Sequence, residues 1–450
     1  MSRVVALIDG EHYPPVVRFA LSALAAEHDV VAAAFAGGTE KVDEAGQTDD
    51  YGVPVVRGAD VLATLAAAIE RYQPDAVVDL SDEPVVSSAD RFALASVALR
   101  RGVEYHGADF RFRPPVRALT TRTPALAIVG TGKRVGKTSV SAHVARRLKA
   151  GGTDVVVLAM GRGGPERPEL LRGDEIALTT ADLLAFARRG LHASSDNYED
   201  AVMGRVTTVG CRRCGGGMAG STFFSNVPEG ARLADDLGRE LIVLEGSGAA
   251  VPPVFSDAAL LVIGAAQGPG YVTDYFGPLR LAGADAVVIA GAEEPLVSAA
   301  QIEAVVAAVR EARPDVPVCT ATFRPRPLEP VRGLRVFFAT TAPAVLLPSL
   351  VRHLEQDHGC IVIAASPHLS DRARLRADLA SAGEFDVCLT ELKAAAIDVV
   401  AAAGEAAGVP TVLCDNVPVG VGGSDLEETI DEVAALAIAR GQGRCAGGES

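Results

Sequence analysis

The sequence has no tryptophan, and aromatic residues make up only 5% of its 450 residues. A core with so few rings must be built from alanine, valine, leucine and isoleucine, which suits parallel sheets covered by alanine-rich helices. A chain of this length exceeds a single hydrophobic core. We therefore expect two or three α/β domains.

Long apolar runs are also missing. No stretch approaches the ~20 apolar residues that cross a bilayer, and the first apolar run, Val4–Ile8, is too short for a signal peptide. The seven cysteines are odd in number and scattered, except for Cys211 and Cys214, which favours reduced thiols over a disulfide framework. A net charge of −15 argues against nucleic-acid or anionic-membrane binding. We expect a cytoplasmic protein with neither of these partners.

Lysine is scarce as well, and the basic residues as a whole are concentrated in one segment. The thirteen basic and three acidic residues between Arg111 and Arg172 give this segment a charge of +10. A local positive field in an acidic protein indicates a compact polyanionic ligand. The five lysines of the whole chain are Lys41, Lys133, Lys137, Lys149 and Lys393.

Short apolar runs alternate with alanine-rich helical stretches along the whole chain, which is typical of β-α units. We divide the chain into a Rossmann-like α/β domain at 1–120, a nucleotide-binding parallel-sheet domain at 121–330 and a small α/β region at 331–450. The first strand leads into Asp9–Pro15, which lacks the glycine spacing of a dinucleotide-binding turn, so NAD binding is excluded. Residues 324–330 are expected to form a linker, and a polar tail is expected from about Gly441.

A phosphate-binding loop is the strongest functional signal. The apolar run Leu126–Val129 is followed by Gly-Thr-Gly-Lys-Arg-Val-Gly-Lys-Thr and then by a helical pattern. Strand, glycine-rich loop and helix are the context of a P-loop, in which backbone amides and one lysine hold phosphates and a threonine hydroxyl holds Mg²⁺. The strict pattern has glycine where this chain has Thr131. We expect ATP and Mg²⁺ as cofactors, with nucleotide contacts from Gly130, Thr131, Gly132, Lys133, Arg134, Val135, Gly136, Lys137, Thr138 and Ser139.

A second element supports this prediction. The strand-like run Leu241–Leu244 ends in Glu245-Gly-Ser-Gly, which is similar to an element of dethiobiotin synthetase-like ligases within the MinD-like class of P-loop proteins. A carboxylate at the tip of a parallel strand is placed to hold Mg²⁺, so Thr138 and Glu245 are the expected metal ligands. The resemblance also implies that Lys133 reaches the nucleotide phosphates.

The whole chain resembles the cyclic 2,3-diphosphoglycerate synthetase family. This resemblance rests on five segments that span nearly all of the sequence: Ala6–Val16, Gly130–Thr138, Met160–Pro165, Glu245–Gly248 and Glu391–Ala396. It implies an ATP-dependent ligase that joins the two phosphates of 2,3-bisphosphoglycerate into an internal phosphoanhydride and releases ADP and phosphate. Such chemistry depends on positioning and charge neutralisation rather than on a protein nucleophile.

Residue roles follow from these observations. We expect catalytic contributions from Lys137, Lys133, Glu245 and Arg162, and substrate contacts from Arg162, Arg167 and Lys393. Guanidinium groups suit phosphate, and the family resemblance marks Lys393. The substrate partner is a small phosphorylated acid, and a homodimer is the expected assembly.

Other interpretations remain open at this stage. A kinase or an amide ligase acting on another small acid would use the same loop, and a nucleotide-gated metal-delivery protein would combine it with Cys211 and Cys214. Acidic and histidine side chains also follow the first and third strands of the N-terminal region, where they could hold a metal or cap helices. They are Asp9, Glu11, His12, Asp79, Asp82 and Glu83.

Overall fold

The computed structural model describes residues 1–42, 51–117 and 120–447. The chain forms two compact units. Unit 1 contains Met1–Pro115 and Pro269–Gly283, and unit 2 contains Val116–Gly268 and Ala284–Ser450. Both are α/β structures. Along the described residues, no helix has the length and apolar character needed to cross a membrane.

Unit 1 is built on a six-stranded sheet with the order β3-β2-β1-β4-β5-β6, in which only β6 is antiparallel to its neighbour. An aromatic cluster around Phe92 of α3 and Phe276 holds the later segment of unit 1 to the earlier one. The strands are β1 (Arg3–Ile8), β2 (Asp29–Phe35), β3 (Val55–Val56), β4 (Ala76–Asp79), β5 (Glu104–His106) and β6 (Arg111–Phe112), and the helices are α1 (Pro14–Leu24), α2 (Val61–Tyr72), α3 (Ser88–Arg100), α8 (Gly270–Thr273) and α9 (Gly277–Ala282).

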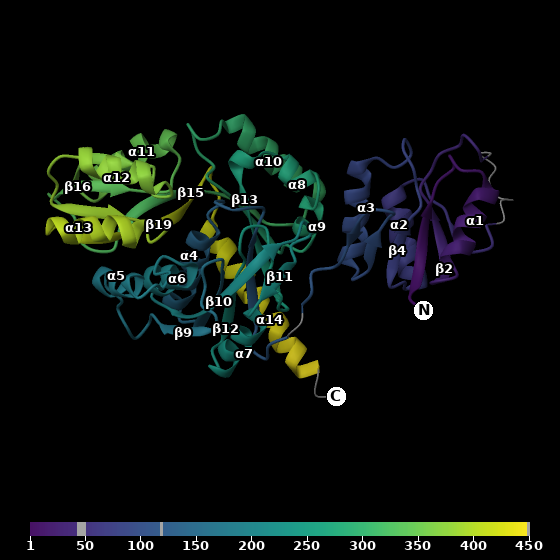
Figure 1. Cartoon of the computed structure of the whole chain (residues 1–450), viewed down its shortest axis with the longest axis horizontal. Coiled ribbons are helices and arrows are strands. Elements are labelled where there is room, and N and C mark those ends of the chain that lie inside the picture. The colour runs from purple at the N-terminus through teal and green to yellow at the C-terminus, as the bar shows by residue number, and fades with distance from the viewer. Residues whose placement is uncertain (43–50, 118–119, 448–450) are drawn as a thin grey trace. The chain divides into compact units, whose positions relative to one another are not determined.

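Unit 2 contains one large sheet (Figure 1), with the order β11-β10-β8-β12-β7-β13-β14-β15-β19-β18-β16-β17 and β9 paired with β10. The pairs from β10 to β15 and from β19 to β17 are parallel, and β15 and β19 join these two halves as antiparallel neighbours. The strands are β7 (Ala125–Gly130), β8 (Val155–Gly161), β9 (Glu169–Arg172), β10 (Thr207–Gly216), β11 (Thr222–Ser225), β12 (Leu241–Glu245), β13 (Ala258–Gly264), β14 (Ala286–Ala290), β15 (Val318–Pro327), β16 (Arg335–Ala339), β17 (Ile361–Ser366), β18 (Val387–Thr390) and β19 (Thr411–Val421).

The helices of unit 2 cover the sheet on both faces. Val157 of β8 packs in the core under α4, whereas the next residue, Leu158, lies beside Gly230 of α7, as alternation along a strand requires. The helices are α4 (Lys137–Ala150), α5 (Thr180–Arg188), α6 (Asp196–Gly204), α7 (Val227–Asp236), α10 (Ala299–Ala312), α11 (Leu347–Asp357), α12 (Arg372–Ser381), α13 (Ala402–Ala407) and α14 (Leu426–Gly447), with a π-helical turn at Ala396–Ala401.

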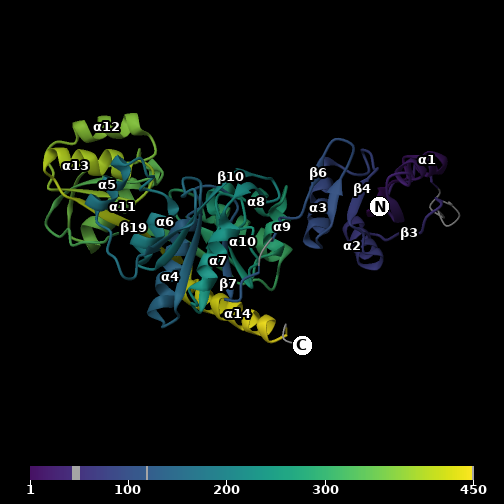
Figure 2. The ribbon, with the colours of Figure 1, turned by 60° about the horizontal axis from the view of Figure 1, so that its bottom comes forward.

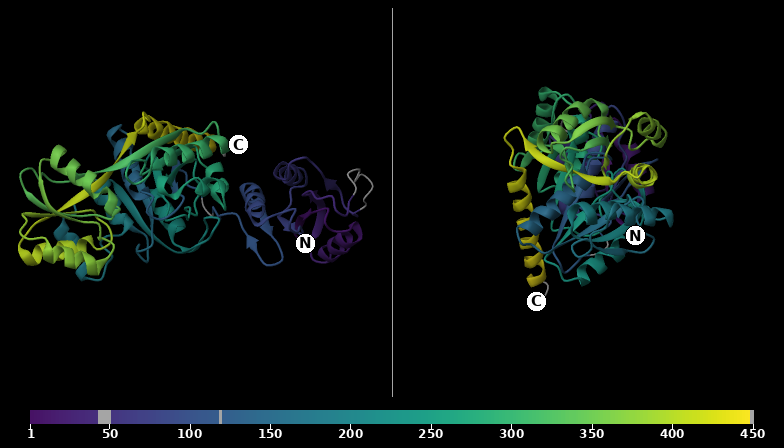
Figure 3. Two further views of the ribbon diagram at one scale, coloured as in Figure 1. Left: turned by 90° about the horizontal axis from the view of Figure 1, so that it is seen from above. Right: turned by 90° about the vertical axis from the view of Figure 1, so that its left-hand side faces the viewer.

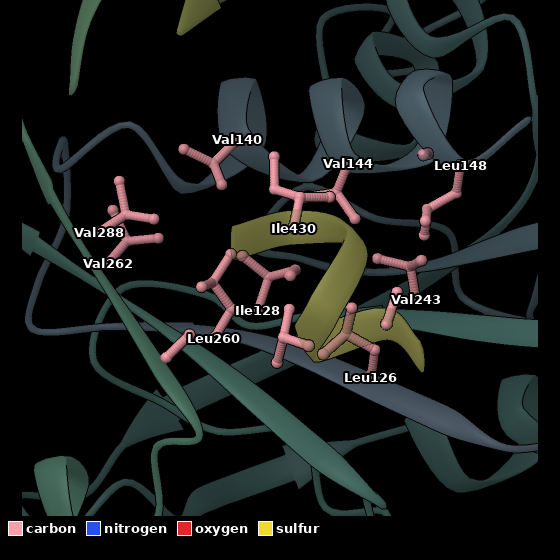
Figure 4. Close-up of a cluster of buried hydrophobic side chains, with 14 of the residues drawn as sticks. Leu126, Ile128, Val140, Val144, Leu148, Val243, Leu260, Val262, Val288 and Ile430 are labelled. Carbon is pink, nitrogen blue, oxygen red and sulfur yellow. The ribbon is translucent and has the colours of Figure 1, made fainter. Parts of the chain in front are cut away.

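The central core of unit 2 lies between the sheet and the helices α4 and α14. Ile430 of α14 packs beside Val140 and Val144 of α4 and above Leu126 and Ile128 of β7 (Figure 4). Figure 2 shows α14 below α4, and Figure 3 shows the chain returning from β19 as α14. The C-terminal helix therefore completes the core under the phosphate-binding loop.

Two expectations about connecting segments are wrong. Residues 324–327, expected in a linker, belong to β15 and pair with β19, and the tail expected from Gly441 continues as α14 to Gly447. The prolines in 324–330 argue against a strand when the sequence is read alone. They are tolerated here because residues 324–327 pair only with β19, beyond the part of β15 that pairs with β14. No single-sequence signal shows that β19, about ninety residues later, supplies the partner.

Candidate functional site

The glycine-rich loop connects the buried strand β7 to the first residue of α4. Lys137 is buried, and its Nζ donates a hydrogen bond to the carbonyl oxygen of Gly132 at 2.8 Å. A Cβ on Gly130 would lie 2.6 Å from Cδ of Lys137, so the lysine stem fills the space that this glycine leaves. The loop thus curls around its own lysine, which lies at a helix N-terminus with free backbone amides.

Gly136 is required for both conformation and packing. Its φ is 90°, and a Cβ there would lie 2.2 Å from the ring of Phe323 on β15. The hydroxyl of Thr131, at the position where the strict pattern has glycine, is hydrogen-bonded to Gln267. Lys133 and Arg134 are exposed at the tip of the loop.

Burial lowers the pKa of Lys137 to about 8, while the nearby carboxylates of Glu245 and Asp196 act in the opposite direction. The positive charges of Arg162 and Arg213 add to the lowering. An anion next to a buried lysine stabilises its charged form, which burial alone disfavours. The electrostatics therefore favour a phosphate-bearing ligand at this position.

Glu245 lies at the carboxyl end of β12, next to β7, and is fully buried. Burial raises its pKa to about 7, repulsion by Asp196 adds to the increase, and hydrogen bonds with Asp200 and the hydroxyl of Thr138 oppose it. Apart from any proton shared with Asp200, Oε2 of Glu245 has no hydrogen-bond partner in the described structure. The two predicted metal ligands, Thr138 and Glu245, are therefore adjacent.

Three further carboxyl groups lie beside Glu245, and sequence reasoning did not find them. Asp196, Glu199 and Asp200 lie on α6; Glu199 and Asp200 are buried, and Asp196 is half-buried. Burial raises the pKa of each, and for Asp200 the proximity of Glu245 raises it further. Their i, i+3, i+4 spacing, which places them near one another on a helix, was the available signal.

Lys393 joins this cluster from a segment more than 250 residues away from the loop. Its Nζ lies 3.0 Å from Oε1 of Glu199 and donates to Oγ of Ser139 at 3.2 Å. Burial would lower the pKa of Lys393, but attraction to Glu199 and Glu391 outweighs burial and raises it. The raised pKa of Glu199, about 8, comes from burial and from repulsion by Asp196 despite this attraction. The 3.0 Å contact and the raised pKa of Lys393 indicate that Lys393 and Glu199 form an ion pair.

Two arginines complete the edge of the site. Arg162 follows β8, and its Nη2 lies 2.6 Å from the position that a Cβ on Gly248 would occupy. Arg213 of β10 donates from Nη2 to the carbonyl oxygen of Ser247 at 2.7 Å, and its buried Nε has no partner in the described residues. Burial and the charge of Arg162 both lower the pKa of Arg213. Repulsion between two guanidinium groups indicates a place for an anion.

Sequence reasoning misses Arg213 as a site residue because its place between Cys211 and Cys214 points to thiol chemistry rather than to a phosphate. Arg167 lies exposed on the loop after Arg162, and no described residue forms an ion pair with it. Of the three predicted substrate contacts, the structure thus brings Arg162 and Lys393 together with Lys137. Arg167 remains an expectation.

Cys211 and Cys214 both lie on β10, three residues apart. An odd separation along a strand turns the two side chains to opposite faces, and Cys211 is buried whereas Cys214 is exposed. Burial raises the pKa of Cys211 to about 12. One chain cannot use this pair to chelate a single metal ion, so the geometry gives no support to a metal-delivery role.

The acidic turns of unit 1 are internally paired. Asp9 accepts hydrogen bonds from the backbone amides of Glu11, His12 and Asp82 and contacts the His12 ring. In the neighbouring turn, Asp79 accepts hydrogen bonds from Ser81, Arg91 and Tyr105. Glu83 lies outside these bonds. Both aspartates therefore stabilise the backbone of their turns, a structural role rather than that of a metal ligand.

The site therefore combines an anion-binding loop with carboxylates and basic side chains on the same sheet edge. Mg²⁺ in phosphoryl-transfer sites uses one or two protein oxygens, substrate phosphates and water. Within the described residues no group of three or more His, Cys, Asp or Glu side chains forms a ready metal cage. The Thr138–Glu245 pair, with its unpartnered carboxylate oxygen, fits this sparser kind of magnesium site.

Comparison with known proteins gives a consistent result along the chain. Three family descriptions match in order: the cyclic 2,3-diphosphoglycerate synthetase N-terminal domain over residues 3–113, its P-loop domain over 125–322 and its C-terminal domain over 327–417. The cyclic 2,3-diphosphoglycerate synthetase of Rubrobacter xylanophilus is 48% identical over 449 residues, which cover 99% of each chain. Proteins of the same name from Methanothermus fervidus and Methanothermobacter thermautotrophicus are 44% and 43% identical over 448 residues, with 97% of each chain covered.

Proposed function

Since the chain belongs to the cyclic 2,3-diphosphoglycerate synthetase family, we propose that it uses ATP to close an internal phosphoanhydride in 2,3-bisphosphoglycerate, releasing ADP and phosphate. The observation that carries this proposal is the position of Lys137 at the start of α4, beside Arg162, Arg213 and Lys393. One basic group is available for a triphosphate, and the others are available for a second polyanion.

In this proposal the loop from Gly130 to Ser139 holds the phosphates of ATP. Backbone amides at the start of α4 bind phosphate oxygens, and Lys137 exchanges its bond to Gly132 for a bond to a phosphate. Thr138 and Glu245 hold Mg²⁺, and Lys133 at the exposed tip closes over the nucleotide. The metal supplies charge neutralisation on the phosphates when it is bound.

The substrate lies against Arg162, Arg213 and Lys393, with Arg167 as a further contact from the same loop. An oxygen of one substrate phosphate attacks the γ-phosphorus, the bond from that phosphorus to ADP breaks, and ADP leaves. An oxygen of the other substrate phosphate then attacks the phosphorus that carries the added phosphoryl group, and inorganic phosphate leaves as the ring closes. The basic side chains hold both substrate phosphates in line and offset their repulsion.

Phosphorus NMR tests this reaction directly. Wild-type protein with ATP, Mg²⁺ and 2,3-bisphosphoglycerate is expected to give coupled anhydride signals together with ADP and phosphate in equal amounts. ADP formation without anhydride signals would favour a kinase and refute the cyclisation. Arg162→Ala and Arg213→Ala should each weaken the anhydride signals, because both remove a basic group from the proposed substrate site. Arg232→Ala, which removes an exposed arginine of α7, is the matched control.

The proposal also covers the organisation of the chain. We divide the chain functionally at about residues 120 and 330, in keeping with the three matched family regions.

We further propose that the protein is a homodimer in the cytoplasm. All seven cysteines are free thiols, which supports a reducing location. Light scattering on the purified protein tests the dimer.

A further inference from the structure

A basic cavity lies toward the C-terminal end of α4, the helix that follows the phosphate-binding loop. It has a volume of about 790 Å³ and is lined by residues of α4, the end of α6, β15, β19 and the start of α14, all within unit 2. Lys149 in its wall is twelve residues after Lys137, which corresponds to about 18 Å along the helix axis. The lining of α4 begins at His143, six residues or about 9 Å along the axis after Lys137, and no residue of the nucleotide loop lines the cavity.

The charges of this cavity are unevenly matched. Arg146 and Arg326 share one buried carboxylate, Asp415, at 2.8 and 3.2 Å. Lys149 donates to the carbonyl oxygen of Arg205, and no described carboxylate forms an ion pair with either of these two side chains. Of these four basic side chains, only Arg146 and Arg326 are within hydrogen-bonding distance of a carboxylate, and they share the same one.

Neighbouring acids offset only part of this excess. Glu427 on the cavity wall is hydrogen-bonded to His143 through Oε1, and its Oε2 lies 3.3 Å from Nε of Arg147, which also binds Asp431. Oε2 of Glu427 has no hydrogen-bond partner in the described residues, so this carboxylate offsets part of the positive charge of the cavity. Asp174, the next carboxylate near Lys149, is paired with Arg239.

Arg146 is the most informative member of the group. Its Nη1 binds Asp415 and the carbonyl oxygen of Met203 at 2.9 Å, while its Nη2 is buried and has no hydrogen-bond partner in the described residues. A buried donor of a charged group is expensive to leave unpaired. Burial lowers the pKa of Arg146, and the charge of Arg326 adds to this effect, although the charges of Asp415 and Glu427 oppose it. The guanidinium group lacks an acceptor that an anion would provide.

We propose that this cavity, the α4 basic pocket, is a second binding site for a compact phosphate-bearing anion. Arg146, Arg205 and Arg326 offer the forked donors that suit phosphate oxygens, and Lys149 adds a point charge. Inorganic phosphate and a phosphorylated acid share this chemistry. The site does not depend on the reaction proposed for the nucleotide loop.

Isothermal titration calorimetry on the full chain, saturated with Mg²⁺ and a non-hydrolysable ATP analogue, tests the proposal. The probes are inorganic phosphate and, in a second arm, 2,3-bisphosphoglycerate. The test variant is Arg205→Asn with Lys149→Gln, because both side chains are exposed and asparagine tolerates the positive φ of 51° at position 205. Arg232→Ala is the surface control, and Arg162→Ala reports binding at the loop.

The expected result is a phosphate affinity that falls about tenfold in the double variant and stays unchanged in Arg232→Ala and Arg162→Ala. In the second arm, two bound molecules of 2,3-bisphosphoglycerate in the wild type and one in the double variant identify the phosphorylated acid as ligand. One bound molecule in both proteins, with the phosphate result intact, identifies inorganic phosphate. Loss of phosphate binding in Arg162→Ala alone, or no phosphate binding to the wild type at millimolar concentration, overturns the proposal.

Discussion

Replacing Glu245 with glutamine separates the chemistry of the site from the stability of the fold. The carboxyl group is fully buried at the end of β12, and burial together with Asp196 raises its pKa from 4.5 to about 7. Glutamine has the same shape and can still hydrogen-bond with Asp200 and Thr138. It removes the charge on which metal binding depends.

The sign of the stability effect follows from the direction of this shift. The pKa of Glu245 is higher in the folded than in the unfolded protein, so the folded state holds more protons between about pH 4.5 and pH 7. The free energy of unfolding therefore falls as the pH rises through this range. At 1.36 kcal/mol per pKa unit, the loss attributable to Glu245 approaches about 3 kcal/mol at pH 8.

We predict that Glu245→Gln lacks this loss and is more stable than the wild type at about pH 8, by up to about 3 kcal/mol, but no more stable near pH 4.5. Its ADP production with Mg²⁺ should fall at least about a hundredfold. The two units need not unfold together, so the free energy is measured by hydrogen exchange of the β12 amides without nucleotide. Glu303→Gln, at an exposed position of α10, is the control. A variant that is less stable than the wild type at pH 8, or that keeps its turnover, would refute the reasoning.

Three further substitutions test neighbouring parts of the site. Lys137→Ala should abolish ADP release while leaving the protein folded by circular dichroism, and turnover within tenfold of the wild type would count against the assignment of the loop. Above about pH 8, where Glu199 is ionised, Lys393→Met should destabilise unit 2 by about 3 kcal/mol because it leaves the Glu199 charge buried without its partner. Adding Glu199→Gln should recover most of that stability in urea unfolding but not the activity, and failure of this rescue would argue against the ion pair. Gly136→Ala should weaken ATP binding and lower the unfolding midpoint, since its Cβ would collide with Phe323; unchanged ATP affinity in a direct titration would contradict the geometry.

The local parts of the site were predictable from the sequence. The loop is contiguous, and its strand, glycines and helix are visible together, as is Glu245 at the end of a second apolar run. The charge excess around residues 111–172 indicated a polyanion. These signals are local because the physics that produces them, which includes backbone turns, helix termini and strand ends, acts over a few residues.

The non-local parts were not predictable. Phe323 closes over Gly136 only because β15 lies on the same sheet as β7, and Asp200 reaches Glu245 only because α6 packs against this end of the sheet. The place of α14 in the core depends on β19 pairing antiparallel with β15, which no period in the sequence shows. Lys393 was singled out by scarcity and resemblance, and its contact with Ser139 required the fold.

A crystal structure with a non-hydrolysable ATP analogue, Mg²⁺ and 2,3-bisphosphoglycerate tests the central claim most directly. We predict a triphosphate enclosed by residues 130–139 with its terminal phosphate on Lys137, and substrate phosphates within hydrogen-bonding distance of Arg162 and Arg213. An empty loop, or a substrate bound away from both arginines, would contradict the account.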